Sequence, residues 1–131
     1  MQVMDTLANL SGSLEPVSDA LRALESGAVD LTLGSDRVRH ELREAIVAAN
    51  GVSAISASSG ENLSAAQRIG VAVDVGEIRG YLVAAAIAWE ASTSRRGEGY
   101  LSRVVAATTG ARKTLELVES TIRSLQDRIG S

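Results

Sequence analysis

The chain contains 131 residues, of which 45% are hydrophobic but only 2% aromatic, and it has no cysteine, one histidine and one proline. This length fits one domain, with a core built from Leu, Ile, Val and Ala. The missing cysteines exclude disulfides and thiolate chemistry, and the single histidine excludes a multi-histidine metal cage in one chain. The net charge of −3 argues against bulk electrostatic binding to nucleic acid or anionic lipid.

The ends and the most apolar stretch carry no targeting or membrane signal. Polar residues follow Met1, so we expect no secretory signal peptide. The stretch 71–91 is interrupted by Asp74, Glu77, Arg79 and Glu90, which makes it too polar for membrane insertion. We therefore expect a protein that is cytoplasmic or exported without a cleaved signal peptide.

The N-terminal third predicts a helix over 3–26. Its apolar residues alternate spacings of four and three, which places them on one side of a helix: Val3, Leu7, Leu10, Leu14, Val17, Leu21, Leu24, Ala28 and Leu31. Gly12 and Pro16 interrupt this pattern, so we expect the helix to restart with Ser13 as N-cap and Pro16 in its first turn. Gly27 is a natural stop, and the segment 28–34 is expected to be a loop.

A second helix is predicted over 35–50. Ser35 is its expected N-cap, apolar residues recur on one face, and Asn50-Gly51 is its expected end. The segment 51–60, GVSAISASSG, is small and polar and is expected to be a loop that is longer than usual. Its serines before Gly60 could also form a phosphate cradle at a helix N-terminus, but no P-loop or dinucleotide pattern is present.

The third predicted helix, 61–92, carries two rows of residues. An apolar row contains Val71, Val75, Ile78, Leu82, Ala85 and Trp89, and a row of small residues at four-residue spacing contains Ala72, Gly76, Gly80, Ala84 and Ala88. Each glycine costs about 1 kcal/mol in a helix relative to alanine. The glycines therefore indicate either close approach of another helix backbone or a break near Val75.

The last predicted helix covers 98–129, after a polar turn. Its apolar residues again alternate three and four: Leu101, Val104, Thr108, Ala111, Leu115, Val118, Ile122, Leu125 and Ile129. The pattern as a whole predicts one all-helical domain over residues 1–131. We expect a three- to four-helix antiparallel bundle, or a long helical hairpin with a shorter N-terminal helical part, with coiled-coil-like contacts.

Few residues point to catalysis or metal binding. His40 and Glu44 are one helical turn apart and could form half of a metal site or a general-base pair, but three protein ligands are the usual minimum. A surface helix with charge pairs is the better explanation of both residues. Arg95-Arg96 is expected to be a solvated turn, or a site for an acidic partner. An enzyme using Glu44, His40 or Asp74 in a cleft is a further alternative, for which the sequence selects no substrate.

The segment 66–81, AQRIGVAVDVGEIRGY, resembles the start of the winged helix-turn-helix regulators of the mercury-resistance type. The resemblance lies in an Ala, a Gly four residues later, a Val, and then Ile78-Arg79 with Tyr81 nearby. It implies DNA binding. Ile78-Arg79 comes two residues later than in that family, and the next residues, LVAAAIAWEA, offer almost nothing that contacts phosphates or base edges.

The tripeptide Trp89-Glu90-Ala91 lies near the end of a predicted long helix, just before a turn. It is similar to the motif of the Trp-x-Gly family of small type VII secretion substrates, bacterial helical hairpins that pair into four-helix dimers. Over 61–131 the resemblance implies an exported hairpin. Ala91 stands where that family has Gly, and the family's export signal, a Tyr with an acidic residue four positions later, is absent because Val104 follows Tyr100.

The sequence favours a non-enzymatic interaction or assembly protein that self-associates or binds a helical partner through apolar stripes. An alanine-rich core is thin, so we expect a single chain to leave one stripe uncovered. The expected interaction surface is formed by Val71, Val75, Ile78, Leu82, Trp89, Leu115, Val118, Ile122 and Leu125. No cofactor, metal or small-molecule ligand is predicted.

Overall fold

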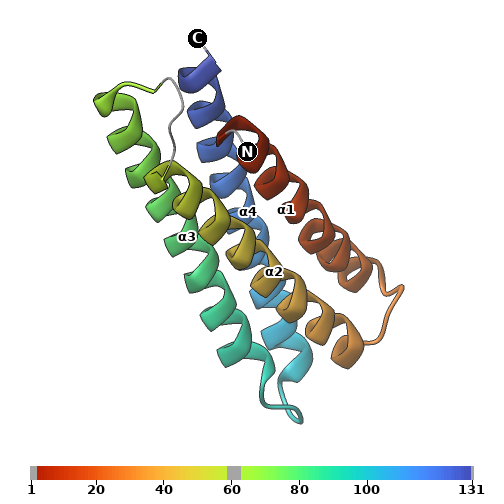
Figure 1. Cartoon of the computed structure of the whole chain (residues 1–131). Coiled ribbons are helices and arrows are strands. Elements are labelled where there is room, and N and C mark those ends of the chain that lie inside the picture. The colour runs from red at the N-terminus through yellow and green to blue at the C-terminus, as the bar shows by residue number, and fades with distance from the viewer. Residues whose placement is uncertain (1–2, 59–62, 131) are drawn as a thin grey trace.

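Four long helices make up the part of the chain that the computed structural model describes, residues 3–58 and 63–130 (Figure 1). They are α1 (Val3–Ser26), α2 (Leu31–Ser58), α3 (Ala65–Thr93) and α4 (Tyr100–Gly130). No strand occurs in these residues. The predicted all-α class is confirmed, in its four-helix form.

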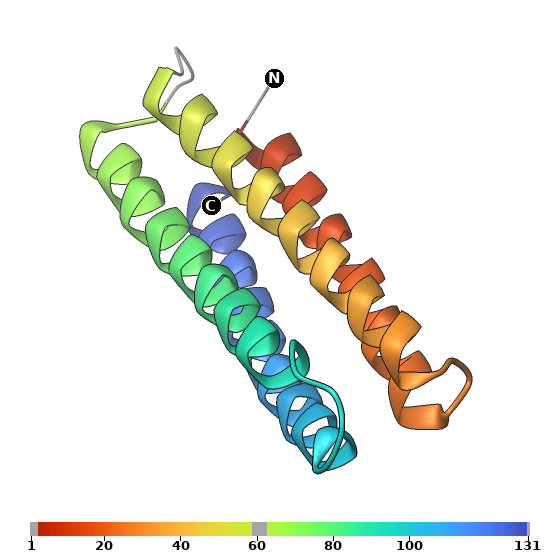
Figure 2. The same ribbon diagram turned by 90° about the horizontal axis from the view of Figure 1, so that it is seen from below.

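The helices run antiparallel to their sequence neighbours and form a four-cornered bundle (Figure 2). Each helix packs on the next one along the chain, α4 returns to pack on α1, and the diagonal pair α2 and α4 barely touch. At about 1.5 Å per residue, the helices are roughly 36 to 46 Å long. Every helix therefore contributes a stripe to one core along the whole bundle.

Helix α1 is continuous through Gly12 and Pro16, so the predicted restart at Ser13 is wrong. The Ser13 hydroxyl does not cap a helix but donates a hydrogen bond to the carbonyl of Leu10 (2.6 Å). Leu10, Leu14 and Val17 are all fully buried on either side of the interruption. Burial of each such side chain contributes about 1.5 to 3 kcal/mol, which offsets the cost of an internal proline.

Helix α2 begins at Leu31, earlier than predicted. The Asp30 carboxylate accepts a hydrogen bond from the backbone N–H of Leu33 (2.9 Å), which is the role expected of an N-cap. Ser35, the predicted cap, is instead buried inside the helix. Gly27 ends α1 as predicted, with a positive φ of 74°. Gly34 is required by packing, because a Cβ there would lie 2.4 Å from the Leu24 side chain of α1.

Helix α2 also ends later than predicted, at Ser58. The predicted loop 51–60 is therefore wrong for residues 51–58, while Ser59 and Gly60 lie outside the described residues. Val52 is fully buried and continues the row of Val38, Leu42, Ala45 and Ala49. Burial of this extra apolar residue favours continuation of the helix past Gly51. Most of the segment that was suggested as a phosphate cradle is therefore ordinary helix.

Helix α3 starts with a capping box at Ser64 and not near Glu61. The Ser64 hydroxyl accepts from the Gln67 N–H (3.1 Å), and the Gln67 side chain accepts from the Ser64 N–H (2.8 Å). From there α3 continues without a break past Val75 to Thr93. Of the two sequence explanations for its glycines, the break is wrong.

A clamp by Arg103 holds the turn between α3 and α4. Its guanidinium donates to the carbonyls of Ser92 (3.2 Å) and Glu98 (3.1 Å) and also to that of Arg95. Gly97 and Gly99 have φ values of 100° and 78°, a region that favours glycine. The turn is thus fixed by its own chain, and α4 begins two residues after the predicted start at 98.

The indole of Trp89 ties α3 to the first turns of α2. Its N–H donates to the Ser35 carbonyl (3.0 Å), and the Tyr100 hydroxyl lies 3.2 Å from the Ser35 hydroxyl. Arg39 on α2 completes this joint by pairing with Asp36 and with Glu90 on α3. Partial burial lowers the pKa of Arg39, but these hydrogen bonds outweigh it and hold the pKa above its usual value.

Replacing Pro16 tests whether α1 is continuous. Pro16→Ala restores a backbone hydrogen bond inside the helix, so we expect the free energy of unfolding to rise by about 2 kcal/mol. Urea denaturation of the two proteins measures this change. An unchanged or lower stability would contradict an internal position for Pro16, because proline is favourable only in a first turn.

Candidate functional site

The nine residues predicted to form the interaction surface all lie in the core of the single chain. They are Val71, Val75, Ile78, Leu82 and Trp89 on α3 and Leu115, Val118, Ile122 and Leu125 on α4, and none is more than 4% exposed. The expectation that a partner covers these rows is therefore corrected. They hold the bundle together and are not accessible to another protein in this fold.

The reason for this correction is the extent of the first two helices. The sequence allowed a hairpin of α3 and α4 with an incomplete N-terminal part. In the structure α1 and α2 are full-length helices, and their own stripes pack against those of α3 and α4. The apolar rows that were expected to need a second protein are covered by the first half of the same chain.

The second row on α3, made of small residues, is exposed along its whole length. Ala72, Gly76, Gly80, Ala84 and Ala88 all face solvent. A Cβ placed on Gly76 or on Gly80 would have no atom within 4 Å. No helix of the described chain packs on this row, so the close approach that the glycines indicated is not made within the chain.

Larger apolar side chains lie on the same side of α3. Ile69, Val73 and Ile87 are 66%, 61% and 66% exposed, which is high for residues of this type. We call the following exposed residues the α3 outer face: Ile69, Ala72, Val73, Gly76, Gly80, Ala84, Ile87 and Ala88. The part of the face within 80–89 contains no charged residue, whereas exposed Glu77 and Arg79 lie beside the part around Gly76. Contiguous exposed apolar side chains on a soluble protein mark candidate interaction surfaces.

A shallow groove between α3 and α4 borders this face. It has a volume of about 410 Å³ and is lined by Ala84, Ala85, Ala88, Trp89, Ser92, Ala106, Ala107, Gly110, Ala111 and Thr114. No charged side chain lines it. The small side chains on both helices widen the surface that an incoming helix could contact from α3 toward α4.

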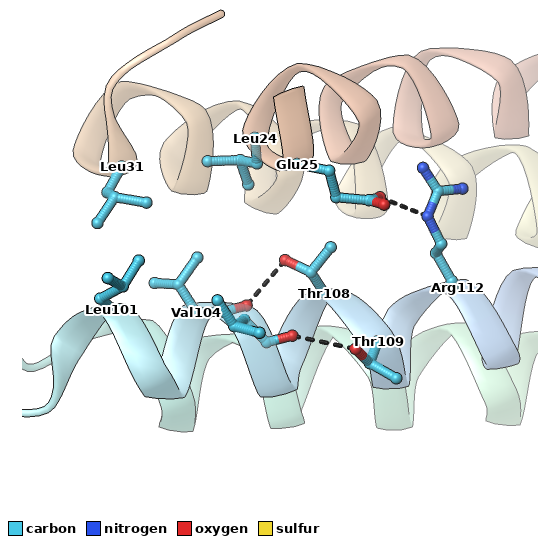
Figure 3. A pocket seen from close by; sticks show the side chains of 9 residues that line it. Leu24, Glu25, Leu31, Leu101, Val104, Thr108, Thr109 and Arg112 are labelled. Atoms are coloured by element: carbon cyan, nitrogen blue, oxygen red, sulfur yellow. Dashed lines mark hydrogen bonds and ion pairs between the residues drawn. The ribbon is translucent and has the colours of Figure 1, made fainter. Parts of the chain in front are cut away.

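A second hollow of about 370 Å³ lies between α4 and the region where α1 ends and α2 begins (Figure 3). Leu24, Leu31, Leu101, Val104 and Val105 supply an apolar lining, as the close-up shows for the labelled residues.

The polar groups of this hollow are already engaged. Thr108 and Thr109 donate to carbonyls one turn back in α4 (2.8 and 3.2 Å), and the Nε of Arg112 pairs with Glu25 (Figure 3). Small-molecule sites usually combine an apolar wall with a few free polar groups that orient the ligand. The internal pairing of these groups makes this hollow a weaker candidate than the α3 outer face.

The residues considered for catalysis are dispersed. His40 and Glu44 are exposed on α2, whereas Asp74 on α3 is largely buried and pairs with Arg128 on α4. Arg95 and Arg96 are exposed at the α3–α4 turn, as the sequence indicated. Within the described residues, no three His, Asp or Glu side chains lie close enough to share a metal ion. The structure does not bring His40, Glu44 and Asp74 into one cleft.

The structure contradicts one of the two sequence resemblances and leaves the other untested. Residues 66–81 lie inside the uninterrupted α3, so the turn that a helix-turn-helix reader needs is not formed there and that interpretation is corrected. Trp89 does lie near the end of a hairpin of two long helices, but its indole is buried against α2. The Trp-x-Gly resemblance stays a prediction.

Comparisons with protein-family models, with curated proteins and with solved structures find no match for this chain. Among the described helices, none is both long and apolar enough to cross a membrane. The α3 outer face therefore has to be interpreted from its own chemistry.

Sequence reasoning found the row of small residues but placed the interaction surface on the neighbouring row. The signal that distinguishes the two is present in the sequence. The row through Val71 and Leu82 consists of residues that fill a core, whereas the row through Gly76 and Gly80 has almost nothing to bury. In this four-helix bundle the row through Val71 and Leu82 packs against the other helices, and the row through Gly76 and Gly80 stays exposed.

A double substitution separates core from interface. Ile122→Asp with Leu125→Asp places two charges at sites that are each 1% exposed, and this costs several kcal/mol per site. We expect loss of cooperative thermal unfolding, measured by circular dichroism, and not dissociation of a folded oligomer.

Leu117→Asp is the matched control, because Leu117 is 52% exposed on the same helix. It should melt within a few degrees of the unmodified protein. A double variant that melts like the unmodified protein would show that Ile122 and Leu125 lie on an accessible surface.

Proposed function

We propose that this protein is a non-enzymatic helical interaction or assembly protein. Its working surface is the α3 outer face, onto which a helix of a second copy or of another protein packs. The observation that supports this most directly is the pair Gly76 and Gly80, exposed in the middle of a continuous helix with open space where each side chain would be.

The argument from these glycines is energetic. Each glycine in a helix interior costs about 1 kcal/mol relative to alanine. Some glycines in this chain have a structural reason: Gly27, Gly97 and Gly99 have positive φ, and a Cβ on Gly34 would clash with Leu24. Gly12, Gly51 and Gly110 are, like Gly76 and Gly80, helical glycines with open space where a side chain would be, but only Gly76 and Gly80 lie one turn apart on the same face of a helix. Gly76 and Gly80 have neither positive φ nor a close neighbour, so in an isolated chain these two glycines only lower the stability of the helix. A helix that packs closely against the backbone recovers this cost through contacts that a Cβ would block.

The chemistry of the rest of the face fits the same role. Ile69, Val73 and Ile87 lie above and below the glycines and offer apolar area to an incoming helix. The nearest charged side chains are engaged at the edges: Arg79 donates to Asn50 on α2 (2.7 Å), and Glu77 accepts from Tyr81 (2.8 Å). A docking helix therefore meets an apolar strip whose charged edges are already held within the chain.

Site-specific photo-crosslinking in living cells tests this proposal. A photoreactive amino acid replaces Ala84 in the centre of the α3 outer face or, as the matched control, Ser120 on the exposed side of α4. We expect a discrete protein adduct from position 84 and none from position 120. Adducts from both positions, or from neither, would contradict the α3 outer face as the working surface.

A further inference from the structure

We infer that the bundle opens along one edge, between α1 and α4, while the contact of α2 with α3 stays closed and acts as the hinge. Figure 2 shows the two hairpins that separate, α1 with α2 and α3 with α4. We call the opening edge the α1–α4 seam. The inference does not depend on the proposed function. It is carried by the packing of the four neighbouring helix pairs and by the polar contacts between them.

The α1–α4 seam is the least closely packed contact between neighbouring helices. The pairs α1–α2, α2–α3 and α3–α4 all pack more extensively. The hollow of about 370 Å³ lies at one end of this seam, where Leu31 faces Leu101 across it (Figure 3). Side chains that line a hollow lose the contacts that a packed core provides. Regions with few buried contacts open at the lowest free energy, so the seam is the place where opening begins.

The side chains that α4 buries are smallest at this end of the seam. Before Arg112 the buried residues of α4 are Val104, Thr108 and Ala111, and after it they are Leu115, Val118, Ile122 and Leu125. Leu101 and Val105, which also line the hollow, are 60% and 57% exposed. Burial of threonine or alanine stabilises a core less than burial of leucine or isoleucine. The first half of α4 therefore has the weaker hold on α1.

An exposed ion pair, which we call the latch, closes the seam at the hollow. The Nε of Arg112 on α4 pairs with Glu25 on α1, and the two side chains are 34% and 45% exposed (Figure 3). Exposed ion pairs contribute little to stability, because water competes for both charges and two long side chains must be held in place. The latch can therefore break and form again at little cost.

The contact of α2 with α3 is held more firmly, at two levels. The indole N–H of Trp89 donates to the Ser35 carbonyl (3.0 Å), and both residues are buried. About three turns earlier in α3, Arg79 donates to Asn50 of α2 (2.7 Å). Breaking a buried hydrogen bond leaves unsatisfied polar groups, which is costly. Tyr100 at the start of α4 bonds the Ser35 hydroxyl, so this contact of α4 with α2 also lies at the hinge.

Each hairpin is fastened within itself. Leu24 of α1 fills the space beside Gly34 of α2, where a Cβ would lie 2.4 Å from it. In the other hairpin Arg103 holds the α3–α4 turn, and Asp74 pairs with Arg128. Separating the two hairpins thus breaks fewer contacts than separating the helices of either one. The opened form exposes from one edge the aliphatic stripes that the closed bundle buries, and the latch controls access to them.

Distances between pairs of nitroxide labels test this motion, since the chain has no native cysteine. Glu15→Cys on α1 with Ser120→Cys on α4 reports on the seam, and Glu44→Cys on α2 with Ala84→Cys on α3 reports on the hinge. All four positions are exposed. In pulsed electron paramagnetic resonance, we expect the seam pair to give a main distance and a longer one in about 1 to 10% of molecules. The hinge pair should give one narrow distance.

Arg112→Gln tests the latch, because it removes the charge and keeps most of the length of the side chain. Arg123→Gln, exposed on the same helix, is the matched control. The first variant should raise the longer-distance fraction of the seam pair about two- to fivefold, and the second should leave it unchanged. A single narrow distance at the seam even in Arg112→Gln, equal effects of the two variants, or a second, longer distance at the hinge overturns the inference.

Discussion

The burial of one aliphatic stripe from each of four helices is the interaction on which the rest of this structure depends. The chain has almost no aromatic residues, so Leu, Val, Ile and Ala must supply the core, and each gives little unless its whole stripe is excluded from water. This requirement keeps α1 helical through Pro16 and extends α2 as far as Val52 can be buried. It also decides which side of α3 remains free, because a four-cornered bundle covers one side of each helix.

Much of this fold could be predicted from the spacing of apolar residues. The rows beginning at Val3, Val71 and Leu101 predicted the helical class and the approximate bounds of α1, α3 and α4, and Gly27 predicted the end of α1. The starts of α2 and α3 were missed because the local caps at Asp30 and Ser64 were not recognised. The other errors have one physical cause, which is that local signals were weighed without the burial that competes with them. Gly12-Pro16 and Asn50-Gly51 favour a break locally, but the neighbouring Leu14 and Val52 are fully buried only if the helix continues. Such burial depends on the other helices and is not contained in any single segment.

The candidate site could be predicted only in part. The spacing of Gly76 and Gly80 pointed to a surface for close helix contact, and the structure leaves that surface exposed. The sequence could not show that the rows of Leu82 and Ile122 would be covered within the chain, because this depends on α1 and α2 reaching full length. Likewise, the resemblance of 66–81 to a helix-turn-helix required a turn, and the capping box at Ser64 together with the continuous burial of Val71, Val75 and Ile78 gives one helix instead.

The joint between α2 and α3 also makes one end of the bundle optically visible. Trp89 is the only tryptophan of the chain, and its indole is buried with its N–H held by the Ser35 carbonyl. Its fluorescence therefore reports on the contact of the first turns of α2 with the end of α3, and not on the opposite end, where α2 ends and α3 begins. If the two ends loosen at different temperatures, emission from this indole and the helical signal of the whole chain will change separately.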